Sequence, residues 1–358
     1  MYSFVYSMLL QFNKLGLVDE KEAARAREED SERRAREADD VLYPDEFELP
    51  HNVAARQRLA RFRGLKSFRT SPWDPKEDLP LDYARVFAFE NFKRAQRRAL
   101  ELAGKVNHNG GPSGADVGMH VCIHICNVPV RSALEIVQRV EASSQGMAPM
   151  MSAWGLLQHE TKLSVLNFSI KKAPGCEEPI ANKEEMCFAT GIRSFSAKPI
   201  FSTDEHGADK HKMERFLHDG RMSMATIYGP IMYPPCPLLA FKKSSVDGKF
   251  NLVATGSLKS CNPDRVIVKK IVLTGFPVKA HRSKAVVRSM FFNAEDVRWF
   301  SPVELWTKHG RRGRIREPLG THGAMKCVFD GPLSQQDTVC MSLYKRVFPK
   351  WPVSQTFA

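Results

Sequence analysis

LVATGSLKSCNPDRVIVKKIVL, residues 252–273, contains two apolar segments on either side of an Asn-Pro-Asp turn. Short segments rich in Val, Ile and Leu that end at such turns are typical of β-strands. Similar segments lie at Met224–Tyr228, Leu238–Lys242 and Thr338–Tyr344. Because a row of short strands separated by turns can close on itself, we expect an antiparallel β-barrel domain over residues 221–351.

Residues 117–220 show a mixed pattern of strand and helix signals. Alternating apolar residues predict strands, whereas apolar residues three or four positions apart predict helices. We expect strands over Met119–Val128, Lys162–Lys171 and Glu185–Ile192, and helices over Val130–Ser143 and Asp209–Leu217, the last with Asp204 or Asp209 as a possible cap. This order predicts a small α/β domain followed by the barrel, and hence the α+β fold class.

The first 116 residues divide into two segments of opposite charge. Residues 1–50 are acidic, with acids and arginines three or four positions apart and no apolar stripe, so we expect an exposed helical segment or linker. Residues 51–116 are basic and contain several prolines, which predicts an extended linker that becomes helical only near its end. The apolar start is too short for a membrane span and lacks the flanks of a signal peptide.

The chain carries a formal net charge of +13 and has a pI near 9.4, although its acids are concentrated in residues 1–50. Lysine and arginine bind phosphates by releasing counterions, so a basic body predicts a polyanionic partner. The eight cysteines are irregularly spaced and include no C-x-x-C pair. This usage is typical of reduced cysteines in an intracellular protein.

The segment HVCIHIC, residues 120–126, places four potential metal ligands on one side of the expected strand. Alternate strand residues lie nearly 7 Å apart, because each residue rises by about 3.4 Å. Zinc holds its ligands at only about 2.0–2.3 Å, so four residues along one straight strand cannot all reach one ion. We therefore predict no metal site and no cofactor, and keep a zinc-stabilised binding module as an alternative.

The common catalytic signatures do not occur in the sequence. It contains no GxxxxGK[ST] phosphate loop, no GxSxG elbow and no HExxH pair. The acids Asp204, Glu205 and Asp330 lie in turn-like settings, where nothing pairs them as acid and base. We predict no catalytic residue and no small-molecule substrate.

The strongest local signal is the run KHGRRGRIR, residues 308–316. The fork of the arginine side chain fits phosphate oxygens, and glycines let a backbone approach them closely. We predict that this run contacts RNA, and a solvated basic hairpin is the alternative. The candidate RNA-binding residues here are Lys308, Arg311, Arg312, Arg314 and Arg316.

A second basic cluster lies in the linker and alternates with Phe62 and Phe68. Arginines beside aromatic residues suit contact with a nucleic-acid backbone and stacking on bases. The alternative is a basic linker whose aromatic side chains dock on the next domain. The candidate RNA-binding residues here are Arg61, Arg63, Lys66 and Arg69, and a weaker third patch comprises Arg94, Arg97 and Arg98.

Three longer segments resemble a known family. They are RGLKSFRTSPWDP at 63–75, FNAEDVRWFSPVELWTKHGRRGRIREPLGTHGAMKCVFDG at 292–331 and DTVCMSLYKRVFPKW at 337–351. Together they resemble the C-terminal part of a family of small-subunit ribosome biogenesis factors that contains the twenty-S rRNA accumulation protein and a nucleolar GTPase. The ending Lys345–Trp351 favours the accumulation branch of this family.

The resemblance implies more than the residue patterns do. Its members have the domain layout of translational GTPases, so residues 51–116 would include part of a preceding barrel. It implies binding to pre-40S rRNA, small-subunit ribosomal proteins and other assembly factors, as a GTPase-like placeholder without catalysis of its own. It also implies a nuclear and nucleolar location, with passage to the cytoplasm on pre-40S particles, and no membrane partner. The alternative is the remnant of a GTP-hydrolysing assembly switch, which GTP binding would favour.

Overall fold

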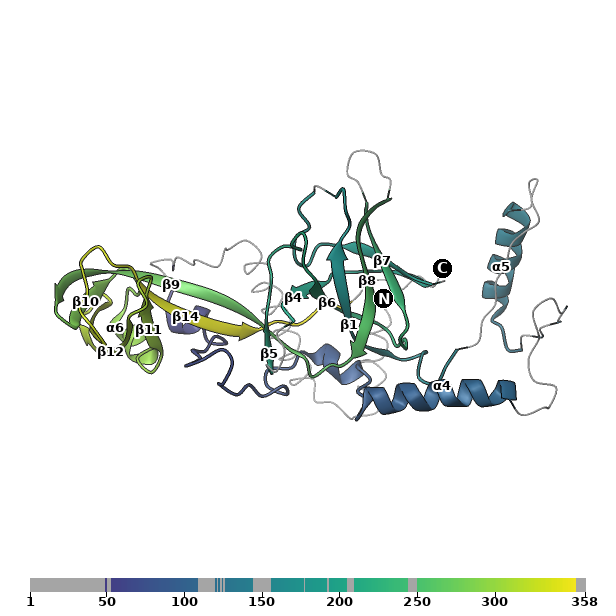
Figure 1. Ribbon diagram of the computed structural model, residues 1–358, viewed down its shortest axis with the longest axis horizontal. Coiled ribbons are helices and arrows are strands. Elements are labelled where there is room, and N and C mark those ends of the chain that lie inside the picture. Colours follow the sequence, from purple (N-terminus) through teal and green to yellow (C-terminus); the bar gives the residue numbers. More distant parts are fainter. Residues whose placement is uncertain are drawn as a thin grey trace, which may run out of the picture.

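We analysed a computed structural model of the chain, which describes residues 49, 53–108, 120, 122, 124, 126–143, 156–176, 178–191, 193–204, 209–243 and 250–351. The apolar start and all but residue 49 of the acidic segment at residues 1–50 lie outside these residues. Figure 1 shows two β-rich lobes joined by long strands.

The helices of the described residues are α3 (Ala55–Arg58), the 3-10 helix η1 (Leu81–Arg85), α4 (Phe92–His108), α5 (Val130–Ser143) and α6 (Ala294–Trp299). The strands of the first lobe are β1 (Leu163–Lys172), β2 (Met186–Thr190), β3 (Arg193–Ala197), β4 (Ile200–Ser202), β6 (Ser223–Pro230), β7 (Pro237–Lys243) and β8 (Phe250–Cys261). The remaining strands are β5 (Lys210–Lys212), β9 (Val266–His281), β10 (Lys284–Arg288), β11 (Glu304–Thr307), β12 (Arg312–Leu319), β13 (Ala324–Phe329) and β14 (Val339–Arg346).

The first lobe is a curled antiparallel sheet with the strand order β3-β2-β7-β8-β1-β6-β4. At its centre β1 pairs with β6 on one side and with β8 on the other. Leu166, Phe168 and Ile170 of β1 alternate along the strand and are fully buried in the first core. This sheet contains strands from both sides of residue 220, so the expected boundary at that residue does not separate two domains.

The second lobe is a closed antiparallel barrel, as the strand pattern predicts. The order β10-β13-β12-β11-β14-β9 is completed by pairing between β9 and β10. The barrel begins with β9 at Val266, because β6, β7 and β8 pair within the first lobe instead. Its core includes Leu305, Ile315 and Met341. The two lobes together with the helices confirm the α+β fold class.

Two expected elements of residues 117–220 are wrong. His120, Cys122, His124 and Cys126 lie in no strand and are exposed. The expected helix Asp209–Leu217 is instead the short strand β5, which pairs in parallel with β9. The edge of a long neighbouring strand here outweighs the weak helical spacing, since local propensity yields to tertiary pairing.

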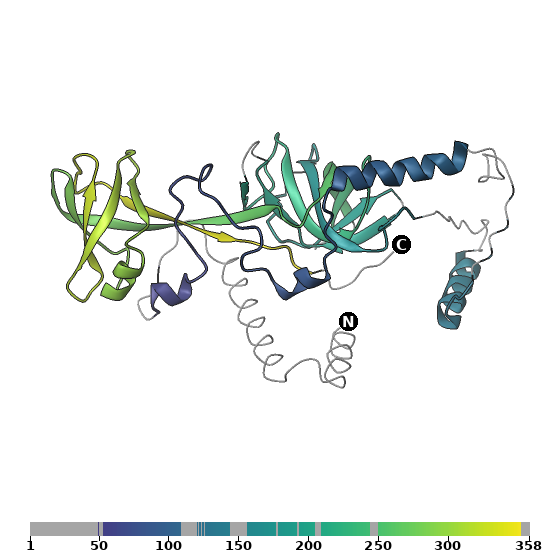
Figure 2. The same cartoon turned by 90° about the horizontal axis from the view of Figure 1, so that it is seen from below.

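The helix Val130–Ser143 is confirmed as α5, but it does not cover the first sheet. Val130, Leu134 and Val137, which share one helical face, are all exposed. Figures 1 and 2 both show α5 standing clear of the two lobes. The small α/β domain that the sequence predicts is therefore replaced by an all-strand lobe with a separate helix.

A segment that we call the strap, residues 63–87, runs from the barrel to the first lobe (Figure 2). At one end Arg63 exchanges two backbone hydrogen bonds with Tyr344 of β14, each 2.9 Å long. At the other end the Phe87 amide donates to Leu163 O of β1. Between these ends, Trp73 packs in a small core with Val268 of β9. The strap therefore contacts both lobes along the strands that join them.

Two buried cations donate hydrogen bonds to backbone carbonyl oxygens of the strap. The Lys210 ammonium is fully buried and donates to Ser71 O of the strap. The Arg346 guanidinium donates to Pro75 O and lies 4.6 Å from the ring centroid of Phe348. A buried cation is costly unless its donors are satisfied, so each cation favours the docked strap.

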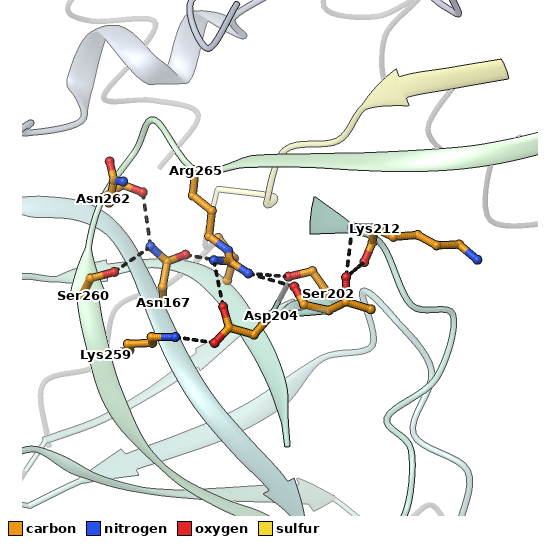
Figure 3. Close-up of polar contacts among 10 residues, drawn as sticks. Asn167, Ser202, Asp204, Lys212, Lys259, Ser260, Asn262 and Arg265 are labelled. Carbon is orange, nitrogen blue, oxygen red and sulfur yellow. Dashed lines mark hydrogen bonds and ion pairs between the residues drawn. The ribbon is translucent and has the colours of Figure 1, made fainter. Parts of the chain in front are cut away.

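A polar cluster connects the start of β9 to the first lobe, as Figure 3 shows. Arg265 donates to Ser202 Oγ and to Thr203 O, at 3.3 and 3.0 Å, and its guanidinium lies 3.6 Å from the Asp204 carboxylate. Lys259 pairs with the same carboxylate. Burial alone would raise the pKa of Asp204, but the hydrogen bond from Lys259 and the charges of Lys259 and Arg265 lower it overall.

His211 lies beside this cluster and is 8% exposed. Its burial, together with the charge of Arg265, lowers the pKa of its imidazole to about 4. At neutral pH the side chain is therefore an uncharged part of the contact between β5 and β9.

We predict that His211 makes the fold sensitive to acid. Between the ordinary pKa of 6.5 and the folded value of about 4, the unfolded chain binds a proton that the folded chain does not. The free energy of unfolding should therefore decrease as the pH is lowered through this window, by up to about 3 kcal/mol from this residue. Urea denaturation between pH 7 and pH 4.5 should show a smaller loss in His211→Gln than in wild type. Replacing the exposed His218 by Gln is the control, and equal losses in wild type and His211→Gln would contradict the prediction.

Candidate RNA-binding surface

The basic run at residues 308–316 folds as the hairpin between β11 and β12. The Thr307 amide donates to Arg311 O, and the Arg311 amide donates to Thr307 Oγ1 at 3.1 Å. Gly310 has a φ of +84°, a conformation that glycine adopts without strain. These bonds make a tight turn, which fixes the register of the arginines that follow it.

Side-chain alternation in the hairpin separates the core from the basic face. Leu305 and Ile315 are buried in the barrel. Arg312, Arg314 and Arg316 lie between the inward positions of β12 and are exposed. Lys308 and Arg311, at the turn, are exposed as well. All five candidates predicted from this run thus lie on one hairpin of the barrel.

Few acids compensate this surface. Arg312 pairs with Glu304 at 3.3 Å. Among the described residues, Arg311, Arg314 and Arg316 have no ion-pair partner within 4 Å. Exposed, unpaired guanidinium groups keep their donors available for an anionic ligand.

The positive surface continues across the barrel. Arg314 pairs in register with Val328 of β13, which pairs with Lys284 of β10. Lys284 is exposed and lies two strands from Arg314, a distance of about 10 Å at the usual strand spacing. On the same strands Lys326 pairs with Glu317 at 2.6 Å. The hydrogen bond and charge of Lys326 lower the pKa of Glu317.

Gly313 allows the hairpin to pack closely on β13. A Cβ atom at this position would lie 2.4 Å from the ring of Phe329, closer than any real Cβ contact. The glycine in the run is therefore needed for packing within the barrel, whereas the sequence reasoning assigned the glycines of this run to close approach of a phosphate.

The second predicted cluster is divided between structure and surface. Arg63 lies 3.6 Å from the centroid of the Trp73 ring and pairs with Glu77 at 2.9 Å, so its guanidinium is engaged within the strap. Phe62 is buried in the barrel core, and Phe68 packs against the core that contains Trp73. This is the alternative in which the aromatic residues dock on a neighbouring domain. The other three candidates, Arg61, Lys66 and Arg69, are exposed.

The weaker third patch lies on α4. Asn91 caps this helix, with its side-chain oxygen accepting from the Arg94 amide at 3.0 Å. Ala99 faces the first core. On the opposite side the exposed basic residues are Lys93, Arg94, Arg97 and Arg98.

Sequence reasoning missed Trp306, which lies on the outer face of β11. It pairs in register with Arg312 and is only partly buried. The signal was present, because Leu305 and Thr307 are inward residues of an alternating strand and Trp306 stands between them. A tryptophan on the outward phase beside a basic run could have been included among the candidates.

The His and Cys residues of the 120–126 segment form one short contact. Cys122 Sγ lies 3.6 Å from His124 Nε2, and both residues are exposed. Within the described residues, no three His, Cys, Asp or Glu side chains lie close enough together to hold a metal ion. The helices of those residues include none that is long and apolar enough to cross a membrane.

The chain matches a family model described as the C-terminal region of the 40S ribosome biogenesis proteins Tsr1 and BMS1, over residues 47–349. Its curated relatives include pre-rRNA-processing protein TSR1 homologs. The human homolog is 50% identical over 334 residues, which cover 93% of this chain and 39% of the human protein. The Dictyostelium discoideum homolog is 48% identical over 321 residues, covering 89% of this chain and 37% of that protein.

The chain thus spans about two fifths of the length of these relatives. Among solved structures, it is similar to translation elongation factor SelB from Methanococcus maripaludis in its apo form. That similarity has a TM-score of 0.46 and 16% identity, and covers 57% of this chain and 46% of the other.

We predict that Arg63 stabilises the fold without contacting RNA. Arg63→Lys keeps the charge but loses the planar stack on Trp73, which should lower the free energy of unfolding by about 1–2 kcal/mol. RNA affinity, measured by fluorescence anisotropy, should change less than about twofold, because the positive charge at this position is conserved. Arg61→Lys is the matched control and should change neither quantity. Loss of affinity at unchanged stability in Arg63→Lys would place Arg63 in the interface.

Proposed function

Because the chain belongs to the family that shares the C-terminal region of the 40S ribosome biogenesis proteins Tsr1 and BMS1, we propose that it takes part in pre-rRNA processing and small-subunit assembly. The family membership supports a role in pre-rRNA processing, and the exposed arginines of β12 support direct contact with RNA. In this proposal the chain binds pre-40S rRNA through the outer face of its barrel, with small-subunit ribosomal proteins beside it.

The proposed contact is mainly electrostatic. Arg311, Arg314 and Arg316 are exposed and lack an ion pair among the described residues, so binding a phosphate breaks no existing pair. Arg314 and Arg316 lie two residues apart along β12, and Arg311 lies at the turn before it. Contacts to phosphate position a protein without reading its sequence. We propose no base-specific recognition by these arginines.

We further propose that the chain acts without catalysis of its own, as a placeholder on the precursor particle. The sequence contains no phosphate-binding loop of the kind on which GTP hydrolysis depends. The names of the relatives, which refer to pre-rRNA processing, support action in the nucleus and nucleolus. Passage to the cytoplasm on pre-40S particles is part of the same proposal.

The arginine hairpin gives the first test. Replacing Arg311, Arg312, Arg314 and Arg316 together by alanine should weaken binding to a small-subunit rRNA transcript. It should also reduce the slope of log Kd against the logarithm of the salt concentration by about 3, because up to four phosphate contacts are lost. The measurement is fluorescence anisotropy at several salt concentrations.

A matched control removes the same charge elsewhere. Lys171 and Lys243 of the first lobe are exposed, as are Lys212 and Arg215 beside it, and joint replacement of the four by alanine leaves the hairpin intact. The control should keep most of the salt dependence. Equal slopes for wild type and the hairpin variant would exclude the hairpin as a contact.

Co-sedimentation gives the second test, at the level of the particle. The tagged full chain should migrate with small-subunit precursors on a gradient at low salt, and less of it should do so at moderate salt. The hairpin variant should dissociate at a lower salt concentration than the first-lobe control. Wild-type chain that stays at the top of the gradient at both salt concentrations would contradict the proposal that these domains suffice for docking.

A further inference from the structure

Trp306 is an aromatic residue on the outer face of the barrel, next to the basic hairpin. Binding to phosphates by charge alone does not require an aromatic side chain there. Trp306 faces outward from β11, opposite Arg312 of β12 on one side and opposite Cys340 of β14 on the other. Leu305 and Thr307, its neighbours along the strand, are both buried. The indole is thus an outward aromatic group placed between two strands, directly beside the basic hairpin.

Hydrogen bonding fixes how the indole lies. Its Nε1 donates to Ser342 Oγ of β14 at 2.8 Å. Cys340 also belongs to the outward phase of β14, but it is only 1% exposed, as expected for a residue beneath the ring. Trp306 itself remains partly exposed. The ring therefore lies against β14 and keeps part of its surface exposed to solvent.

Cations surround this aromatic surface. The ammonium of Lys270 lies 5.6 Å from the centroid of the Trp306 ring. Arg312 lies across from the ring on the neighbouring strand, where it pairs with Glu304 at 3.3 Å. Arg314 follows on the same side of β12, opposite Glu304 in the strand register. Adjacent strands are about 4.8 Å apart, so an aromatic face and two guanidinium groups lie within one nucleotide's reach of each other.

We propose that Trp306 together with Arg312 and Arg314 forms a binding site for unpaired RNA, in which a base stacks on the indole and its flanking phosphates contact the arginines. Aromatic rings bind bases of single strands, because every base has a free π-face once it is unstacked. A duplex holds its bases inside the helix and offers the surface only its phosphates. This inference rests on the proposed RNA-binding function and adds to it a preference for single strands.

The competing role for Trp306 is structural, as a cover for Cys340. That role predicts that phenylalanine, or any large apolar side chain, would serve as well. It also predicts that a loss of binding would follow a loss of fold and affect every ligand equally. Selectivity between single and double strands therefore separates the two roles.

The test compares a 12-nucleotide oligouridine with a blunt-ended RNA duplex of equal total charge, both labelled for anisotropy and measured with the full chain. Trp306→Leu should weaken oligouridine binding about tenfold, as expected for loss of one stacked base, and duplex binding less than twofold. Trp306→Phe should give an intermediate loss for oligouridine. The control is Trp299→Leu, which removes a 59% exposed tryptophan of α6 on the same barrel and should change neither affinity.

Fluorescence provides an independent measurement if Trp306→Leu fails to fold. Oligouridine should quench part of the tryptophan emission of the wild-type chain, and this quenching should disappear in Trp306→Phe but persist in Trp299→Phe. Equal quenching in all three proteins, or equal loss of both ligands in a folded Trp306→Leu, would overturn the stacking proposal. If the arginine variant still weakens binding in that case, only the stacking is excluded. If it does not, the proposed RNA-binding function fails too.

Discussion

The arrangement of the molecule depends on two buried cations beneath a short stretch of irregular chain. Lys210 and Arg346 donate to backbone carbonyls of the strap, at Ser71 and Pro75. An ammonium or guanidinium group that loses such an acceptor inside a protein carries a free-energy cost of several kcal/mol, so undocking the strap is strongly disfavoured. The strap in turn closes the aromatic core around Trp73, where the strands of the barrel reach the first lobe. Both cations therefore favour the docked position of the strap at the place where the lobes meet.

Closure of the barrel explains why its outer face can be so basic. Each barrel strand has a partner on both sides, and the apolar side chains needed for stability all point inward. The outward positions contribute little to the core, so arginines there cost little stability. A rigid strand also holds neighbouring charges at constant spacing, which reduces the conformational entropy lost on binding. The barrel thus holds its outward side chains on a rigid support, while its inward side chains form the core.

Sequence reasoning succeeded where the signal was local and failed where pairing was distant. The barrel, α5 and the strand β1 were predictable, because alternation and helical spacing are properties of neighbouring residues. The domain boundary at residue 220 was not predictable, since nothing local shows that β1 pairs with both β6 and β8. The exposed position of the hairpin arginines agrees with what their composition indicates, whereas the contacts of Arg63 with Trp73 and Glu77 depend on the folded strap and could not be predicted. Trp306 was not predicted as a candidate, although the alternation of Leu305 and Thr307 indicates its outward position.

The length of β9 has a consequence for any partner that touches both lobes. This strand runs uninterrupted for 16 residues, from the polar cluster at Arg265 to the far end of the barrel. At about 3.3 Å per residue it spans roughly 50 Å, and β14 lies along much of it. Contact points at the two ends of β9 are therefore separated by a gap that the length of this strand sets. A ligand whose two contact points match this gap gains the second contact at high effective concentration, and a ligand of another size gains nothing from it.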